Sequence, residues 1–410
     1  MRIFLGLNNV ASMFIDLKEA FKVLGVDTFI VNKGVTHQII NHYSDFTIEK
    51  AKNRVTYFKP RRISTHVKSW WNRNVDKYVL KKAIKECDVF IFFWDTIMYD
   101  YSDLAEIKKA GKIIIPVFVG DDVRWYHSMK QEFVSYQMHP IEYEAEYDTS
   151  IVGLERRLRY LRNAEKYADF IFSRLDQAQL QLRPYYRWNM MVPCKKIIEQ
   201  TNQRKIKPIV AHAPSHRNVK GTQYVLAAFE RLKKEGVDFE PLLIENVSNP
   251  EAIKMYANAD ILIDQLLCPG AGKLATEGLA SGTIVMGHMA YDRYPQKNPN
   301  DCPIIDVNPD TLYEKLKELI LNYDFRKAHA KKGRSYAEKH LDVNIFCKKV
   351  LALINNEKIE FDYTPTFYRD TFIPESAEAK KVYNKWNDYV SDCDWYKKTI
   401  VPEERAGLLF

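Results

Sequence analysis

Two cations stand three residues apart where an apolar run gives way to a helical pattern. They are Arg217 and Lys220, and the apolar run before them is Pro208–His212. A guanidinium forms forked hydrogen bonds and an ammonium is a compact charge, so the two together can hold one diphosphate. The backbone amides that begin the next helix would add to this attraction. By themselves, however, two such residues are more typical of an ordinary solvated basic loop.

A glycine pair further along the chain offers a second candidate site for phosphate. Gly270 and Gly272 directly precede a helical pattern, Lys273–Ser281, which carries Glu277. Glycines let a ligand approach the backbone closely, and free amides at a helix start can bind phosphate oxygens. The Glu277 carboxylate could accept hydrogen bonds from a ribose diol. A lone glycine pair is a weak signal, so a tight loop with an ordinary surface glutamate is the alternative.

The elements that would position these residues alternate in both halves of the chain. Short apolar runs such as Ile3–Leu7, Val89–Trp94 and Ile113–Val119 are separated by helical patterns, and Asp260–Leu266 repeats the arrangement near the glycine pair. Buried parallel strands are apolar along their whole length, and helices connect them by crossovers. The pattern therefore predicts an α/β protein with two doubly wound, Rossmann-like domains.

The length of 410 residues also exceeds what one ordinary domain holds. An irregular, Pro-containing stretch at 181–206 favours a boundary there, between a domain at 1–190 and a second domain at 205–355. The remaining segment, 356–410, is too aromatic for a disordered tail. We expect it to pack on the body of the protein, with Ala377–Val390 helical.

Composition limits the partners and the compartment. The net charge of +8 suits anionic substrates or an anionic membrane surface, and a soluble protein that is merely basic fits it equally well. The six cysteines form no Cys-x-x-Cys pair, and no His, Asp and Glu set indicates a metal, so we expect reduced thiols in a cytoplasmic protein. His212 and His216 border the basic loop and are interpreted as structural. Met1 leads directly into an apolar run, so we expect no signal peptide.

A basic and aromatic cluster at 59–73 has two interpretations. It could bind an anionic lipid-linked acceptor or membrane headgroups, or it could be a partly packed surface helix. No recognisable nucleic-acid module accompanies it, so we expect no nucleic-acid partner. The cluster consists of Lys59, Arg61, Arg62, Lys68, Trp70, Trp71 and Arg73.

Several anchors recur in order over the basic loop and the glycine pair, and together they resemble a known family. They are His212–Thr222, Glu245, Tyr256–Gln265 and Gly272–Gly282. This order resembles the carboxy-terminal domain of retaining GT-B glycosyltransferases of the large bacterial group 1, family 4-like type. The resemblance implies two Rossmann-like domains that face each other across a cleft, with the final helix crossing back to the amino-terminal domain.

The resemblance also implies roles for the site residues. Arg217 and Lys220 would hold the donor diphosphate and stabilise it as it leaves, and Glu277 would bind the ribose. The expected donor-binding set is Ser215, Glu245, Gly270, Gly272, Lys273 and Glu277. Transfer would retain the anomeric configuration and need neither a metal ion nor a cofactor, with the leaving phosphate taking the acceptor proton. The donor would be a UDP-, GDP- or TDP-linked sugar.

An amino-terminal loop resembles the Gly-Ser-Asp-x-Arg loop of the same family. In Phe118–Arg124, the residues Gly120, Asp122 and Arg124 would border the acceptor or brace the cleft. The alternative is that Asp122 and Arg124 form a structural ion pair that caps the strand. Val119 stands where many relatives have a histidine, so a histidine-assisted step is not supported.

A second departure from the pattern leaves the donor sugar open. Pro269 stands where the family commonly has a first glutamate, and Asp264 or Gln265 could replace its sugar contact.

We expect sugar transfer from a nucleotide-sugar to a saccharide or lipid-linked acceptor, in surface polysaccharide or glycoconjugate synthesis. The protein would act in the cytoplasm, and contact with the inner face of the plasma membrane stays open. The alternatives are a nucleotide-sugar epimerase on the same fold and a catalytically silent binding subunit.

Overall fold

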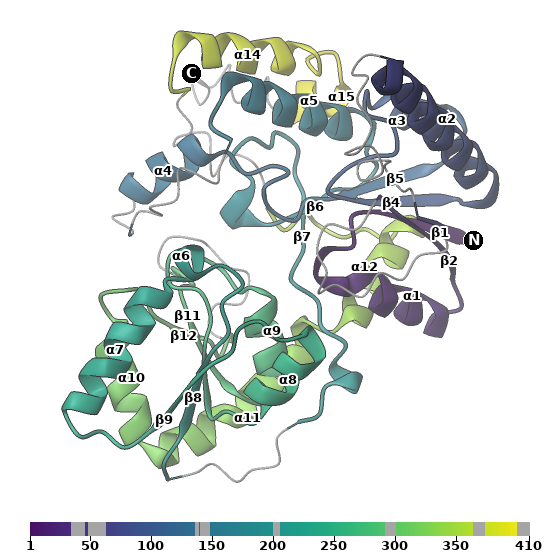
Figure 1. Ribbon diagram of the computed structural model, residues 1–410. Coiled ribbons are helices and arrows are strands. Elements are labelled where there is room, and N and C mark those ends of the chain that lie inside the picture. The colour runs from purple at the N-terminus through teal and green to yellow at the C-terminus, as the bar shows by residue number, and fades with distance from the viewer. Residues whose placement is uncertain are drawn as a thin grey trace. The chain divides into compact units, whose positions relative to one another are not determined.

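The chain divides into two compact units, each with its own parallel sheet (Figure 1). The first unit comprises Met1–Ser128, Thr149–Trp188 and Cys347–Phe410, and the second comprises Met129–Asp148 and Asn189–Phe346. The computed structural model describes residues 1–33, 46–47, 63–135, 139, 148–199, 206–291, 301–363 and 374–399.

These units differ from the predicted domains at two boundaries. Residues 129–148 belong to the second unit although they lie inside 1–190, and the chain re-enters the first unit at Cys347 rather than at residue 356. The second difference arises because the boundary falls inside α12, Val343–Ile354. A continuous helix carries no loop signal by which a sequence could reveal a domain boundary.

The first unit contains a seven-stranded parallel sheet in the order β3-β2-β1-β4-β5-β6-β7. Its central strands are apolar because both faces are covered, and every residue of β4 is buried. The strand order reverses between β1 and β4, and ligands of such sheets bind beyond the carboxyl ends of the strands at this reversal. The strands are β1 Arg2–Leu7, β2 Asp27–Asn32, β3 Phe46–Thr47, β4 Val89–Phe93, β5 Ile113–Val117, β6 Phe172–Ser173 and β7 Tyr186–Arg187.

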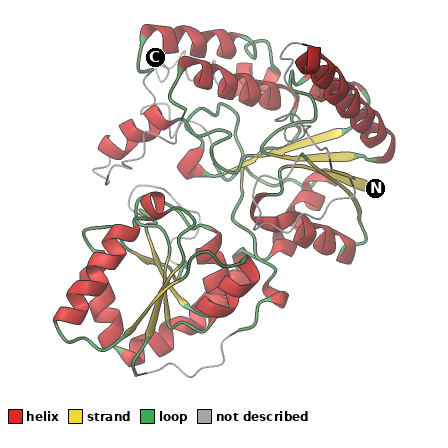
Figure 2. Ribbon diagram, in the orientation of Figure 1, coloured by secondary structure: helices red, strands yellow, loops and turns green. Residues whose placement is uncertain are grey.

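Helices cover both faces of this sheet (Figures 1 and 2). One face carries α1, and the other carries α2, α3 and α5. The helices of this unit are α1 Met13–Val23, α2 Ile63–Glu86, α3 Ser102–Lys109, α5 Ile151–Tyr167, α14 Ala377–Asp388 and α15 Asp394–Thr399, and α4 Tyr126–Ser135 begins at its border.

The carboxy-terminal helix α14 packs along α5. The Arg162 side chain is fully buried between them, where it donates to Asn387 Oδ1 at 3.0 Å and to Glu165 Oε2 at 2.7 Å. Glu165 is equally buried, and it also accepts from the Leu182 amide at 2.6 Å. This buried ion pair and its hydrogen bonds join the final segment to the rest of the first unit.

The second unit contains a five-stranded parallel sheet in the order β12-β11-β10-β8-β9. Here the order reverses between β8 and β10, so the ends of those two strands mark the expected ligand position. The strands are β8 Ile209–His212, β9 Glu240–Leu243, β10 Ile261–Ile263, β11 Ile284–Gly287 and β12 Ile305–Asp306. The helices are α6 Arg217–Lys220, α7 Thr222–Lys234, α8 Asn249–Ala257, α9 Lys273–Ala280, α10 Leu312–Leu321 and α11 Tyr323–His340.

The helices of the second unit form one layer on each side of its sheet. Contacts join α7 to α10, and they join α9 to both α8 and α11. The two sheets with helices on both faces confirm the predicted class of two doubly wound α/β domains. Within the described ranges, no helix is both long and apolar enough to cross a membrane.

Candidate functional site

The ends of β8 and β10 bring the predicted phosphate-binding residues together in the second unit. Lys220 ends the short helix α6 after β8, and Asp264 directly follows β10. The Lys220 ammonium donates to Asp264 Oδ1 at 2.6 Å and to Gln265 Oε1 at 3.0 Å. The side chains of Lys220 and Asp264 are 12% and 2% exposed. The cation therefore lies at the strand reversal, held by two acceptors.

Asp264 also connects Lys220 to the start of α9. The Gly272 amide donates to Asp264 Oδ2 at 3.0 Å, so one carboxylate accepts from an ammonium and from the helix start. A β-carbon on Gly272 would lie 2.9 Å from Asp264 Oδ2 and 3.1 Å from Lys220 Nζ, which explains why glycine stands there. An ammonium beside a helix-start amide is the donor pair that suits a phosphate oxygen.

Arg217 lies on the same loop but has a different partner. Its guanidinium Nε donates to Glu245 Oε1 at 2.8 Å, and the side chain is about half exposed. Hydrogen bonds from Arg217 lower the pKa of Glu245, which follows β9. Ser215 is exposed between β8 and α6. The structure thus brings four predicted residues to one edge of the sheet: Ser215, Arg217, Lys220 and Glu245. The two cations have different carboxylate partners, because Arg217 pairs with Glu245 and Lys220 pairs with Asp264.

His212 has a structural position at the end of β8, in agreement with its interpretation. Its Nδ1 lies 2.8 Å from the Ile263 carbonyl, and its Nε2 lies 2.9 Å from Thr222 Oγ1. A carbonyl only accepts, so Nδ1 carries the proton and Nε2 accepts from the threonine hydroxyl. Burial lowers the pKa of His212 to about 4, which keeps the ring neutral. The ring therefore connects β8 to β10 and to the start of α7.

Glu277 is buried inside α9, so it is not the ordinary surface glutamate that was the alternative. Its Oε2 accepts from the hydroxyl of Tyr256, and its Oε1 lies 3.7 Å from Lys273 Nζ. Burial and the neighbouring carboxylate raise the pKa of Tyr256, so the phenol stays protonated and donates. Lys273 Nζ also donates to the Met191 carbonyl at 2.6 Å. Ribose binding by Glu277 stays a prediction.

The residues suggested as substitutes for the missing first glutamate have other partners. Asp264 is bound by Lys220 and Gly272, and Gln265 donates from Nε2 to the Gly270 carbonyl at 2.7 Å. Gly270 itself has φ +92°, a conformation that favours glycine. Sequence reasoning missed the ion pair between Lys220 and Asp264. Its signal was a carboxylate placed directly after a buried strand.

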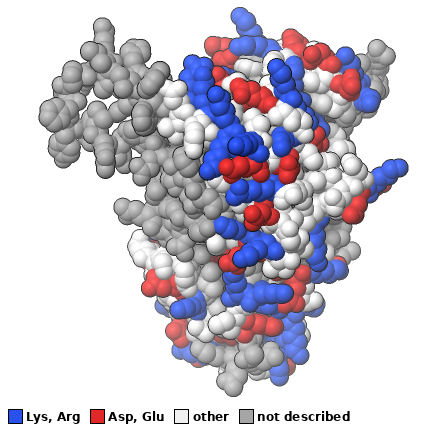
Figure 3. Space-filling model, turned by 90° about the vertical axis from the view of Figure 1, so that its right-hand side faces the viewer, with Lys and Arg blue, Asp and Glu red and all other residues white. Residues whose placement is uncertain are grey.

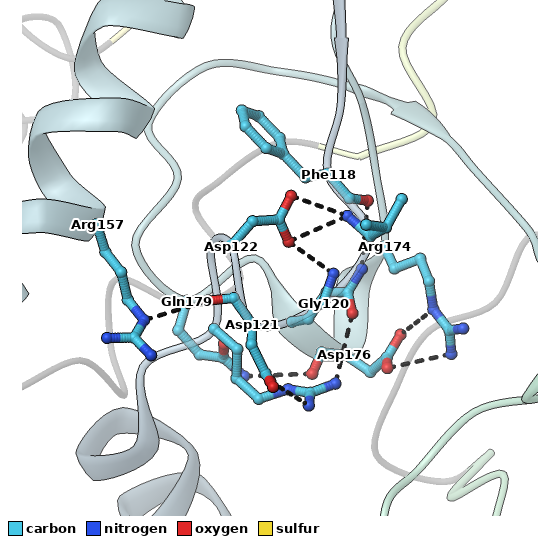
Figure 4. Close-up of polar contacts among 11 residues, drawn as sticks. Phe118, Gly120, Asp121, Asp122, Arg157, Arg174, Asp176 and Gln179 are labelled. Atoms are coloured by element: carbon cyan, nitrogen blue, oxygen red, sulfur yellow. Dashed lines mark hydrogen bonds and ion pairs between the residues drawn. The ribbon is translucent and has the colours of Figure 1, made fainter. Parts of the chain in front are cut away.

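In the first unit, the loop after β5 is organised around Asp122 (Figure 4). Its buried carboxylate accepts from the Gly120 amide at 2.7 Å and from the Val119 amide at 3.1 Å. Burial raises the pKa of Asp122 to about 7. Arg124 pairs with Asp121 at 3.0 Å, which is not the partner that the structural interpretation of this loop gave it. Asp122 caps backbone amides instead, because the tight turn points them at its side chain.

Most of the basic and aromatic cluster lies outside the described residues. Lys59, Arg61 and Arg62 are not described, and neither are the side chains of Lys68, Trp70 and Trp71. Arg73 is described and lies 3.9 Å from Asp100. Lys and Arg side chains alternate with Asp and Glu over the face shown in Figure 3.

Comparisons with protein-family models and with curated proteins found no match. Solved structures do match. An alpha-glucosyltransferase in complex with UDP and a 13-mer DNA containing a HMU base has a TM-score of 0.57 at 13% identity, over 87% of this chain and 99% of that one. Sucrose-phosphate synthase from Thermosynechococcus elongatus has a TM-score of 0.53 at 12% identity, over 87% and 100%. The N-terminal domain of Candida albicans trehalose-6-phosphate phosphatase has a TM-score of 0.55 at 11% identity, over 87% and 97%.

These similarities extend over nearly the whole length of each matched structure, and their low identity limits what they show to the fold. The chain has the two-domain GT-B fold that the matched glycosyltransferases share. The resemblance to one particular glycosyltransferase family, and the mechanism that it implies, stay predictions.

Proposed function

We propose that this protein transfers a sugar from a nucleotide-sugar donor to a saccharide or lipid-linked acceptor, in surface polysaccharide or glycoconjugate synthesis. The observation that carries the proposal is the position of Lys220 beside the start of α9, at the strand reversal of the second unit. Structures with the same fold include an alpha-glucosyltransferase in complex with UDP-glucose, which supports a nucleotide-sugar as the donor.

The chemistry of the transfer follows from where charge develops. When the bond between sugar and phosphate breaks, negative charge gathers on the leaving diphosphate and positive character on the sugar ring. The Lys220 ammonium and the Gly272 amide are donors held near one another, so both can be directed at that charge once the donor is bound. To receive phosphate oxygens, Lys220 and Gly272 shift part of their hydrogen bonding from Asp264 to the donor. Arg217 similarly moves its hydrogen bonds from the Glu245 carboxylate to the phosphate.

Helix α9 supplies the remaining contacts to the donor. Tyr256 and Lys273 fix the Glu277 carboxylate within the first turns of this helix, where we place the ribose hydroxyls. The anomeric carbon breaks its bond to the phosphate and forms one to the acceptor oxygen, with its configuration retained and without a metal ion. The leaving phosphate oxygen takes the proton of the acceptor hydroxyl. The donor is a UDP-, GDP- or TDP-linked hexose.

Lys220→Ala tests this proposal. The substitution removes a preorganised donor from the developing charge, so we expect kcat to fall by about 10²–10³. The donor is first identified by the thermal shift that UDP-, GDP- and TDP-sugars produce, and turnover is then measured as release of the nucleoside diphosphate. Lys254→Ala, which changes an exposed lysine on α8, is the matched control and should keep full activity. Near-normal turnover in Lys220→Ala would contradict the assignment.

A further inference from the structure

Trp94 is an exposed indole at the carboxyl edge of the first unit's sheet. It directly follows β4, whose five residues are buried at 1% exposure or less, yet Trp94 itself is 37% exposed. Its φ of +74° lies in the left-handed region, which a bulky residue rarely adopts. Strained residues of this kind gather at functional sites. The backbone therefore turns a large apolar ring outward at the end of a buried strand.

The ring stands at the position where such a sheet binds ligands. β4 pairs with β1, and the strand order reverses between these two strands. The segment that follows β1 is irregular as well, because Ala11 and Ser12 have φ values of +49° and +58°. Two segments with left-handed residues therefore flank the same reversal.

The loop predicted to border the acceptor lies next to this ring. A β-carbon placed on Gly120 would lie 3.9 Å from Trp94 Cζ3. Figure 4 shows Gly120 and Asp121 together in that loop. Within the part of the chain that the structure describes, Trp94 takes part in no pair of stacked rings and no cation–π contact. In contrast, Trp125 and Trp188 are buried in the core.

Two carboxylates that adjoin this contact in sequence can accept hydrogen bonds from hydroxyls. Asp95 and Asp121 each adjoin one of the two contacting residues in sequence, and their side chains are 33% and 46% exposed. Asp95 Oδ1 accepts from the Thr96 amide at 2.9 Å, and Asp95 Oδ2 has Lys33 Nζ at 3.5 Å. Asp121 Oδ1 accepts from Arg124 at 3.0 Å. A carboxylate has about four acceptor sites, so each of the two keeps further acceptor capacity. Carboxylates accept hydrogen bonds from sugar hydroxyls, and they have no proton to donate to the phosphates of a nucleic acid.

Phosphate is also disfavoured at the start of α1, the helix that follows the reversal. The Phe14 amide donates to Asn9 Oδ1 at 2.9 Å, so the side chain of Asn9 already occupies this amide. The segment between β1 and α1 contains no glycine that would let a phosphate approach the backbone. A neutral polyhydroxyl ring therefore fits this edge better than a phosphate or a nucleic acid.

We propose that Trp94 is the platform on which a sugar ring of the acceptor stacks, with Asp95 and Asp121 accepting hydrogen bonds from its hydroxyls. The apolar C–H face of a pyranose lies against the indole, as apolar surface packs on an aromatic face. This inference rests on the proposed function, and it adds that the acceptor contributes a saccharide, free or lipid-linked, and not a nucleic acid.

Trp94→Gly tests the platform with a variant that should fold. Glycine adopts the left-handed conformation freely, so the substitution removes the ring and relieves the backbone. Transfer from the donor found by thermal shift is measured to a panel of p-nitrophenyl hexosides and to a single-stranded oligonucleotide. We expect wild type to use at least one hexoside, and Trp94→Gly to raise the KM for that hexoside about tenfold or more. Trp94→Phe, which keeps a ring, should lie between them.

Donor hydrolysis in the absence of acceptor separates this inference from the proposed function. This hydrolysis should be unchanged in Trp94→Gly. The control Tyr78→Ala removes an exposed aromatic ring on α2, and it should change neither donor hydrolysis nor the hexoside KM. An unaltered hexoside KM in Trp94→Gly would overturn the platform. Transfer by wild type to the oligonucleotide would also overturn it. So would a wild type that hydrolyses the donor but transfers to none of the hexosides. If no nucleotide-sugar is bound or hydrolysed at all, the proposed function fails first and the platform fails with it.

Discussion

The pair of Lys220 and Asp264 shows how a single residue can prepare a phosphate site. A lysine side chain is long and flexible, so an ammonium in solvent would have to be ordered when the donor binds. Here Asp264 and Gln265 already hold it beside the helix start, at 2.6 Å and 3.0 Å. Preorganised donors stabilise developing charge without reorganisation in the reaction. Asp264 is thus a positioning residue for Lys220 in the proposed reaction.

At the same scale, the neutral ring of His212 predicts how stability depends on pH. Its pKa is about 4 in the folded protein against an ordinary value near 6.5. Between these values the unfolded chain binds a proton that the folded chain does not, so stability is lost as the pH falls from about 6.5 towards 4. On acidification from pH 7.5 to 5, wild type should lose about 2 kcal/mol more than His212→Gln, measured by urea unfolding.

The His212→Gln variant is the control for other groups that titrate in the same range. Burial raises the pKa of Asp103 and of Asp122 to about 7. The folded protein binds protons at these carboxyls first, so they add stability as the pH falls below about 7, opposite to His212. Both carboxyls remain in wild type and variant and cancel in the comparison. Equal losses in the two proteins would show that His212 is not held neutral by the fold.

At the scale of elements, the start of α9 is the most constrained part of the candidate site. Gly272 has φ −81°, so alanine fits its backbone, but its β-carbon would come within 2.9 Å of Asp264 Oδ2 and 3.1 Å of Lys220 Nζ. Gly272→Ala must therefore displace the ion pair. We expect it to weaken donor binding about tenfold or more, measured by calorimetric titration with the donor.

Gly287→Ala is the matched control for that substitution. Gly287 ends β11, and a β-carbon there would meet only ordinary contacts, at 3.5 Å from the Gln265 carbonyl and 3.6 Å from Asp264 Cβ. Donor affinity should change little in this variant. If Gly272→Ala bound the donor as tightly as Gly287→Ala, the start of α9 would have no part in the donor site.

Elements differ in how well the sequence predicts them, and pattern length explains why. The strands β4 and β10 are apolar throughout because helices cover both faces, so their runs were evident. β7 has only two residues, Tyr186–Arg187, which is too short for any periodicity, and it was not predicted. The sequence does not predict α4, Tyr126–Ser135, either, because the residue before it, Trp125, is not a typical helix-capping residue.

At the scale of the whole molecule, the residues of the site could be predicted but their partners could not. Arg217, Lys220 and Gly272 stand out by type and spacing at predicted strand and helix ends. The partner of Lys220 is 44 residues away in sequence, and it is placed by the register of β10 against β8, which pairs Ile263 with His212. Register depends on the packed sheet and not on any local pattern.

The boundaries between the units also depend on contacts between segments that are distant in sequence. Residues 129–148 and the end of α12 are assigned by contacts across the fold, so composition along the chain does not reveal them. The aromatic content of the final segment did predict packing, and α14 realises it through Arg162 and Asn387 on the first unit. Sequence patterns thus predict layers and loop ends better than they predict which segment closes which unit.

The most direct test of the account is a crystal structure of the protein bound to the nucleotide-sugar that gives the largest thermal shift. In that complex we expect Lys220 Nζ and the Arg217 guanidinium each to lie at hydrogen-bonding distance, about 3 Å, from oxygens of the diphosphate at the end of β8. A complex in which the diphosphate is bound elsewhere, while both side chains keep their pairs with Asp264 and Glu245, would contradict it.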